Sequence, residues 1–308
     1  MIHRGYHKTS SKIYYIKIML CPCPDNKEST ILYKSDNKNN KIDFKCTSEI
    51  HSKPVLYKCK KCSLIFSEHI NSKFEEAYGD VEDEKYIQQI PFKKKYFDLF
   101  FSKIKSHLNI NHNVLEIGSY YGILGSIIRP HVKNYTGLEL SKHAAEYSKK
   151  NFGLDITNMP LDKFLNNNTL FDVIIMNDVI EHLDNPFKAL SLIEKNLVPN
   201  GILIFTTFNM DSMLPKIMKG RYHWIMPMHK FYFSNSTLKH FLKSSNMNVF
   251  KIKSDTRLVS AEYLLSKFCI LFPRIDFIFK FFLKFNFLRK ITTRINLFDL
   301  NIYFAKKL

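Results

Sequence analysis

Two glycines and an acidic residue have the spacing of a nucleoside-binding turn. An apolar run at 114–117 ends at a turn that carries Gly118 and Gly122, and the next apolar run, after a short helical pattern, ends at Glu139. A turn whose backbone N–H groups approach a ligand closely favours residues that lack a Cβ atom. An acid about twenty residues further on, at the tip of the second strand, can accept both ribose hydroxyls. The stretch therefore predicts a nucleoside-containing cofactor over the carboxyl ends of a parallel sheet, with plain βαβ packing as the alternative.

A second set of polar residues follows another buried strand. The apolar run 173–176 is typical of a central strand, and Asn177 and Asp178 come directly after it. Ligands of open parallel sheets bind at this end of the strands. We therefore expect Asn177 and Asp178 at the same edge of the sheet as the glycine turn.

Four cysteines near the N-terminus have the spacing of metal ligands. They form two pairs, Cys21-Pro-Cys23 and Cys59-Lys-Lys-Cys62. Paired thiolates on tight turns make a tetrahedral four-sulfur zinc site, and the metal would stabilise a segment too small to fold alone. Cys46 is an alternative fourth ligand, and cysteines without a metal are the other interpretation. A Cys-x-x-Cys pair in a chain with six cysteines indicates a reducing, cytoplasmic compartment.

Size and charge bound the class of protein. A length of 308 residues with 45% apolar residues fits one main domain with a small appendage. The net charge of +18 suits nucleic acid, an anionic lipid surface or an acidic substrate, but Lys, Asn and Ile are abundant along the whole chain, so compositional bias explains the charge equally well. The N-terminus is basic and then apolar, but Lys17 interrupts the apolar part and no small-residue cleavage site follows, so we do not expect a signal peptide.

The motifs resemble those of class I S-adenosylmethionine-dependent methyltransferases. The first motif of that family usually reads [D/E]-x-G-x-G-x-G; Glu116, Gly118 and Gly122 match it, and Tyr120 stands in place of the middle glycine. The stretch FDVIIMNDVIEHLDNP at 171–186 closely resembles the fourth-strand motif of the family. The cysteine pairs resemble the zinc-ribbon-like head of one group within it.

The resemblance implies a fold, a cofactor and a set of binding residues. The fold is an α/β Rossmann-like sheet, mostly parallel with an antiparallel closing edge strand, and the cofactor is S-adenosylmethionine. The residues expected to bind it are Glu116, Gly118, Gly122, Glu139, Leu161, Asn177 and Asp178. A tyrosine is strained at positive φ, so Tyr120 implies a reshaped turn or weak cofactor binding, and a non-catalytic cofactor-binding protein is an alternative.

The resemblance also implies methyl transfer to a small-molecule acceptor. The related group acts largely on small molecules and sugars, so we expect a hydroxyl of a sugar or related metabolite, in surface-polysaccharide or natural-product biosynthesis. An oxygen acceptor has to lose its proton near neutral pH, which favours histidine, and His182 and His229 are the candidates. His182 can instead brace the start of a helix, His229 can anchor a loop, and in some quinone-pathway relatives a pair like Glu181 and His182 helps to bind a divalent cation.

An RNA base methyltransferase is a second alternative, because some of these enzymes combine a zinc head with strong positive charge. The basic residues here are diffuse along the chain, so we do not expect nucleic acid as a partner.

The C-terminal part carries many Phe residues interleaved with Lys and Arg. It contains no uncharged run long enough for a spanning helix. Our first expectation is a packed lid or dimer helix, and the alternative is a helix in an anionic membrane interface.

The expected division of the chain has five segments. They are an extension or mistaken start at 1–18, a zinc-ribbon-like unit at 19–70, the methyltransferase domain at 71–256, a basic Phe-rich helical insertion at 257–296 and a closing strand at 297–308.

Overall fold

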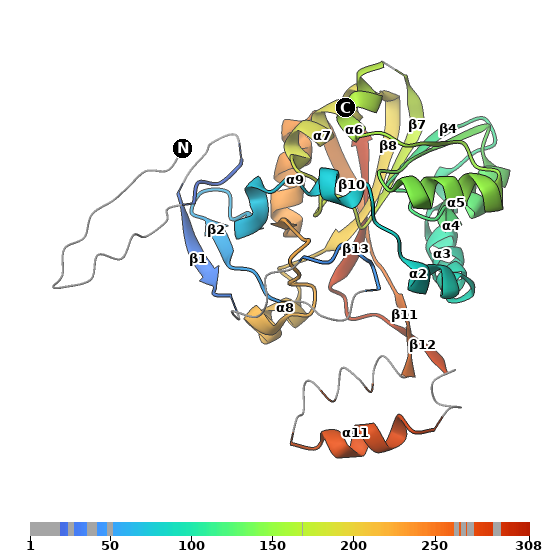
Figure 1. Cartoon of the computed structure of the whole chain (residues 1–308). Helices are drawn as coiled ribbons and strands as arrows, with labels where there is room; N and C mark the ends of the chain where they lie inside the picture. Colours follow the sequence, from blue (N-terminus) through green and yellow to red (C-terminus); the bar gives the residue numbers. More distant parts are fainter. Residues whose placement is uncertain are drawn as a thin grey trace.

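The computed structural model describes residues 19–23, 28–35, 42–47, 52–167, 169–261, 265, 269, 274–285 and 291–308. The extension expected at 1–18 lies outside these residues, as do Arg289 and Lys290 of the Phe-rich segment. Figure 1 shows a head with β1 and β2, a central α/β unit, and a hairpin that carries α11 away from that unit.

A seven-stranded sheet forms the core, in the order β10-β13-β8-β7-β4-β5-β6. Five strands are parallel: β4 (Asn113–Ile117), β5 (Asn134–Leu138), β6 (Ile156–Thr157), β7 (Phe171–Asn177) and β8 (Leu197–Phe208). The other two are β10 (Met247–Ser254) and β13 (Leu300–Lys307), and β13 runs antiparallel to both of its neighbours. The apolar run 173–176 is fully buried in β7, because helices cover both faces of the sheet.

Helices cover the two faces of this sheet in sets of three. On one face lie α3 (Ile90–Ile104), α4 (Ile123–Ile128) and α5 (Lys142–Phe152). On the other lie α6 (Leu161–Phe164), α7 (Pro186–Lys195) and α9 (Asn235–Ser244). Further short helices in the described part of the chain are α1 (Phe74–Tyr78), α2 (Glu84–Gln88) and α8 (Met213–Met218). Among the described residues, no helix is both long enough and apolar enough to cross a membrane.

The closing strand differs from the expectation in its position. β13 was expected at the edge of the sheet, but it lies between β8 and β10, so β10 is the edge strand. Its side chains are therefore covered on both faces, and Ile302, Tyr303 and Phe304 are fully buried. Asn301 tolerates this position because its amide donates to Asn235 Oδ1 at 3.3 Å.

The head forms a second, antiparallel sheet in the order β1-β2-β3-β9. Its strands are β1 (Ser29–Tyr33), β2 (Leu56–Cys59), β3 (Ile65–Ser67) and β9 (Phe231–Tyr232). By sequence β9 belongs to the central unit, and only Lys230 separates it from His229. The head is therefore built onto the segment that carries one of the two candidate catalytic histidines.

The C-terminal insertion has a strand at each end and not helix throughout. β11 (Arg257–Ser260) pairs antiparallel with β12 (Thr292–Ile295), and α11 (Asp276–Phe282) lies between them in sequence. β-branched residues such as Val259, Thr292 and Thr293 favour this pairing.

Candidate active site

The glycine turn connects β4 to α4 and has the conformation that its sequence predicts. Gly118 and Gly122 have φ values of 75° and 74°, in the left-handed region. A Cβ atom on Gly118 would lie 2.5 Å from Val179 Cγ2, and one on Gly122 would lie 2.7 Å from Ser148 Oγ. Both positions therefore need glycine for conformation and for space.

Tyr120 adopts the strained conformation expected from its position in this turn. Its φ is 46°, a region that is costly for a bulky residue. The surroundings compensate for that cost, since Tyr120 N–H donates to Glu139 Oε2 at 2.7 Å and Ser148 Oγ donates to Tyr120 O at 3.0 Å. Its ring packs edge-on against Tyr86 and Tyr121, each at 4.6 Å between centroids. These hydrogen bonds and ring contacts hold Tyr120 in the turn.

Glu139 lies at the end of β5 and faces the turn. Its side chain is buried, and its second oxygen accepts a hydrogen bond from Ser141 N–H at 2.7 Å. Burial raises the pKa of Glu139 to about 7. The adjacent loop closes on the same place, because Asn158 Nδ2 donates to Glu139 O at 2.8 Å and Leu161 is buried at the start of α6. The structure thus brings Gly118, Glu139 and Leu161 to one edge of the sheet.

Glu116 has a structural partner within the sheet. It is buried in β4 and accepts a hydrogen bond from Tyr135 Oη at 2.6 Å, across to β5. Burial raises the pKa of this carboxyl to about 8. A direct contact of Glu116 with the cofactor therefore remains a prediction, whereas its bracing of β4 on β5 is observed.

Asp178 follows β7 and is part of an ion pair that the sequence did not predict. It has a φ of 54°, and Thr206 Oγ1 donates to its Oδ1 at 2.6 Å. Arg257 donates to Oδ2 at 2.7 Å, and its guanidinium lies 5.1 Å from the Tyr96 ring and 5.4 Å from the Trp224 ring. Arg257 comes from β11, 79 residues further along the chain than Asp178, and no motif marks it in the sequence. Asn177 lies at the same strand end.

Glu181, His182 and His229 form the cluster with the chemistry for proton transfer. Their ligand-type atoms all lie within 4.8 Å of one another, although 47 positions (229 − 182) separate the two histidines. The imidazole rings meet edge to face at 4.7 Å between centroids. The structure therefore brings together the two histidines that were singled out separately in the sequence.

Backbone carbonyls orient both imidazoles. His182 Nδ1 lies 3.1 Å from Met228 O, and His229 Nδ1 lies 2.8 Å from Trp224 O. A carbonyl only accepts, so each neutral ring carries its proton at Nδ1 and its lone pair at Nε2. Burial lowers the pKa of His182, which keeps it neutral near pH 7.

Glu181 is the least satisfied member of this cluster. It is buried, and within the described part of the chain its Oε2 has no hydrogen-bond partner. Burial, followed by the charge of Asp178, raises the pKa of Glu181 to about 8. A buried carboxylate oxygen beside two imidazoles fits a divalent cation, which would satisfy that oxygen.

Tyrosines from the stretch 78–86, on the N-terminal side of β4, cover the glycine turn. Tyr78 and Tyr86 contact Tyr120 at 6.3 and 4.6 Å between centroids. Asp83, which the sequence analysis did not select, is buried and accepts from Tyr120 Oη at 3.2 Å and from Tyr86 N–H at 3.1 Å. This aspartate links the covering segment to the turn.

The four predicted metal ligands lie together in the head. Cys21, Cys23, Cys59 and Cys62 offer sulfur atoms within 4.8 Å of one another, and Cys46 lies outside this group. Backbone N–H groups point at the sulfurs, with Cys62 N 3.5 Å from Cys59 Sγ and Cys23 N 3.4 Å from Cys21 Sγ. Such bonds stabilise thiolates on tight turns, which fits a four-sulfur zinc site.

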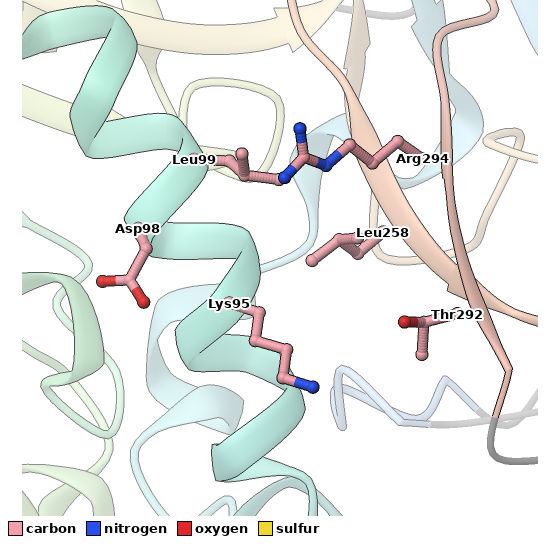
Figure 2. Close-up of a pocket in the computed structure, with 6 residues that line it drawn as sticks. All are labelled: Lys95, Asp98, Leu99, Leu258, Thr292 and Arg294. Carbon is pink, nitrogen blue, oxygen red and sulfur yellow. The ribbon is translucent and has the colours of Figure 1, made fainter.

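A cavity of about 380 Å³ lies apart from these residues, between α3 and the β11–β12 hairpin. Figure 2 shows Lys95, Asp98 and Leu99 on the helix and Leu258, Thr292 and Arg294 on the hairpin. None of the predicted site residues lines it.

Comparison with known proteins identifies the fold as that of a methyltransferase domain. Residues 84–252 match a family model described as "Methyltransferase domain". A crystal structure of an S-adenosylmethionine-dependent methyltransferase from Archaeoglobus fulgidus superposes with a TM-score of 0.50 at 16% identity, covering 73% of this chain and all of that one. At this identity the likeness shows the fold alone.

Curated relatives match over part of the chain. The ubiquinone biosynthesis O-methyltransferase of Pasteurella multocida is 26% identical over 111 residues, which is 31% of this chain and 46% of the relative. The protein of that name from Rickettsia prowazekii is 32% identical over 114 residues, 35% of this chain and 45% of the relative. The chain thus spans about half the length of the relatives it matches. Together with the strand order and the glycine turn, the family match shows that this chain belongs to the class I S-adenosylmethionine-dependent methyltransferases.

Proposed function

We propose that this methyltransferase transfers the methyl group of S-adenosylmethionine to a hydroxyl oxygen of a small-molecule acceptor. The observation that carries the proposal is the cluster of Glu181, His182 and His229 beside the cofactor edge of the sheet. The names of the curated relatives specify an oxygen acceptor. They give no support for the sugar expected from the sequence, so the proposal is confined to a hydroxyl group.

The chain has two tasks in such a reaction. The sulfonium of the donor is already reactive, so the protein mainly aligns donor and acceptor and excludes water. Glu139 would accept the ribose hydroxyls, the Gly118–Gly122 turn would receive the methionine part, and Leu161 would pack on the adenine. Asn177 and Asp178 would border the transferred methyl group.

The second task, removal of the acceptor proton, would fall to the cluster of Glu181, His182 and His229. As the O–CH₃ bond forms and the S–CH₃ bond breaks, the hydroxyl proton passes to Nε2 of His182 or His229, and S-adenosylhomocysteine leaves. A neutral imidazole is needed for this step, and the lowered pKa of His182 provides it near pH 7. Alternatively, Glu181 and the same Nε2 lone pairs of His182 and His229 would hold a divalent cation, which when bound makes a coordinated hydroxyl more acidic and replaces the imidazoles as the activating group.

Methyl transfer from labelled S-adenosylmethionine to hydroxylated acceptors tests the proposal. Replacing His182 or His229 by Ala should lower kcat by about 10²-fold or more, while the Kd for S-adenosylmethionine stays close to that of the unchanged protein. His240→Ala is the matched control, because this histidine is exposed on α9 and outside the cluster. Full activity in both cluster variants, or transfer only to nitrogen or RNA, would contradict the proposal. Activity that chelation abolishes and Mg²⁺ or Zn²⁺ restores would assign the cluster to a cation.

We further propose that the head binds one Zn²⁺ through Cys21, Cys23, Cys59 and Cys62. Three of the four cysteines are buried, and the sulfur atoms are close enough for one ion. The metal would be structural, because four sulfur ligands leave no open coordination position.

A further inference from the structure

The tip of the β11–β12 hairpin presents apolar side chains to solvent. Figure 1 shows α11 at the end of this hairpin, away from the central sheet. No residue of α11 is buried. A lid over the cofactor edge would have to contact the glycine turn between β4 and α4, and α11 lies away from both elements (Figure 1). The described residues of α11 therefore do not cover the glycine turn.

The exposed apolar residues lie on one face of the helix. Phe277 and Phe281 are four positions apart, as are Ile278 and Phe282, which places each pair on one side of the helix. Their exposed fractions are 65% for Phe277, 40% for Ile278, 55% for Phe281, 43% for Phe282 and 40% for Phe285. Ile275, just before the helix, is 42% exposed, and the remaining apolar side chains of the segment, Phe279 and Leu283, are half-buried. The most apolar face of α11 thus points outward, opposite to the arrangement in a helix that packs on its own core.

Basic residues border this apolar face. The tip at 274–285 contains Arg274, Lys280 and Lys284 against one acid, Asp276, so its net charge is +2 (3 − 1). Lys280 pairs with Asp276 at 2.6 Å, on the side of the helix that carries Lys284. At the base of the hairpin, Arg294 lines the cavity opposite Lys95 (Figure 2). Exposed aromatic residues bordered by cations are the pattern of a helix that lies in a bilayer interface.

A second copy of this chain is a less suitable occupant than a membrane. Each copy has a net charge of +18, and two tips would meet with the same sign. An anionic bilayer has the opposite sign and accepts Phe and Ile side chains below its head groups. Charge complementarity therefore selects the bilayer.

We propose that residues 274–285 form a peripheral membrane anchor, with the apolar face of α11 in the interface of an anionic bilayer and Lys280, Lys284 and Arg274 at its head groups. The proposal does not depend on which acceptor the enzyme methylates. It concerns a segment outside the matched family region, which ends at residue 252.

Vesicle flotation of the full-length protein tests the anchor. The protein should float at low salt with vesicles of phosphatidylcholine and phosphatidylglycerol, and much less with phosphatidylcholine alone. Phe277→Ser with Phe281→Ser should abolish flotation at moderate salt without changing the net charge, so this variant separates insertion from general attraction of a basic protein. Lys280→Gln with Lys284→Gln should weaken vesicle binding by up to about fivefold per lysine.

The matched control is Ile110→Ser with Leu170→Ser. These residues are 63% and 50% exposed, just before β4 and β7, at the opposite edge of the sheet from the active site. The control should float like the unchanged protein and keep its affinity for S-adenosylmethionine. Flotation of the Phe variant equal to that of the unchanged protein would overturn the proposal. It would equally be overturned if the unchanged protein fails to float and sediments as a dimer that the Phe variant dissociates, because the face would then be covered by a second copy.

Discussion

At the scale of single residues, the cofactor edge depends on one carboxylate with two tasks. Glu139 holds the turn through Tyr120 N–H and is also the residue proposed to accept the ribose hydroxyls. The local spacing of Gly118, Gly122 and Glu139 was enough to predict their shared position, since one strand–turn–helix–strand unit connects them. Arg257 could not be predicted, because its contact with Asp178 depends on the path of a hairpin outside the family motif.

Replacing Glu139 should change both the affinity for the cofactor and its pH dependence. A charge-assisted pair of hydrogen bonds contributes roughly 1.5–3 kcal/mol, so Glu139→Ala should raise the Kd for S-adenosylmethionine about tenfold or more. The pKa of Glu139 is raised to about 7, so the carboxyl is mostly neutral at pH 6 and mostly charged at pH 8. The charged form accepts hydrogen bonds more strongly, and affinity should therefore increase as pH rises through 7.

Isothermal titration from pH 6 to pH 8 measures this effect. Glu139→Gln is the control, because it keeps the shape of the side chain and cannot titrate; its affinity should be weaker and nearly constant over this range. An unchanged Kd in Glu139→Ala would contradict the assignment.

At the scale of elements, the loop after β7 is joined to the head by one buried lysine. Lys230 is fully buried beside β9 and donates to Asp184 Oδ1 and to Ser72 O. Lys230 N–H also donates to Glu181 O at 2.9 Å. The sequence predicted the buried strand β7 before this loop but not the junction with the head, since β3 and β9 are far apart in the chain. The sequence predicted a closing strand at 297–308, but it could not show that a further strand, β10, would pair with the outer side of that strand.

Removing Asp184 should lower the free energy of unfolding more than removing its ion-pair partner, Lys230. Asp184→Ala leaves a fully buried ammonium without its counter-charge, which should lower the free energy of unfolding by roughly 3 kcal/mol. The side chain of Asp184 is 33% exposed, so water can solvate it in Lys230→Met. The decrease in the free energy of unfolding should therefore be clearly smaller in Lys230→Met than in Asp184→Ala.

Urea unfolding midpoints of the two variants give the comparison. Asp162→Ala is the control, because Asp162 pairs with Lys188 on the surface, where a salt bridge contributes at most about 1 kcal/mol. An equal decrease in the free energy of unfolding for Asp184→Ala and Asp162→Ala would show that other groups compensate the charge of the buried Lys230.

At the scale of the whole molecule, three parts meet at the active site. The head supplies the sheet that includes β9, the central unit supplies the cofactor edge, and the hairpin supplies Arg257. The cysteine spacing in the sequence predicted the metal ligands, and the structure brings all four together. The shared sheet, by contrast, has no signal in the sequence, because two residues of β9 are too few to form a recognisable pattern.

Removing zinc from the head should therefore also impair catalysis. Protein purified without added metal should contain one zinc per chain, and Cys59→Ser should lower both the zinc content and the melting temperature. Because β3 pairs with β9 next to His229, kcat should fall more than the affinity for S-adenosylmethionine. Elemental analysis, thermal unfolding and turnover measure the three effects.

Cys46→Ser is the control for this experiment, since Cys46 lies outside the cluster. Clearly substoichiometric zinc together with normal folding of Cys59→Ser would rule out the metal site.

The pairing of β3 with β9 also determines when the head can complete its sheet during synthesis on the ribosome. The head emerges first, but its last strand begins 164 residues (231 − 67) after β3 ends. At roughly 5–20 residues per second of synthesis, the outer edge of β3 stays unpaired for about 8–33 s. During that interval the nascent head has three strands and whatever metal its cysteines have captured. Arrested chains that end before and after β9 should consequently differ in the protease resistance of residues 52–67, because the head is synthesised before the central unit but is completed only by a strand from it.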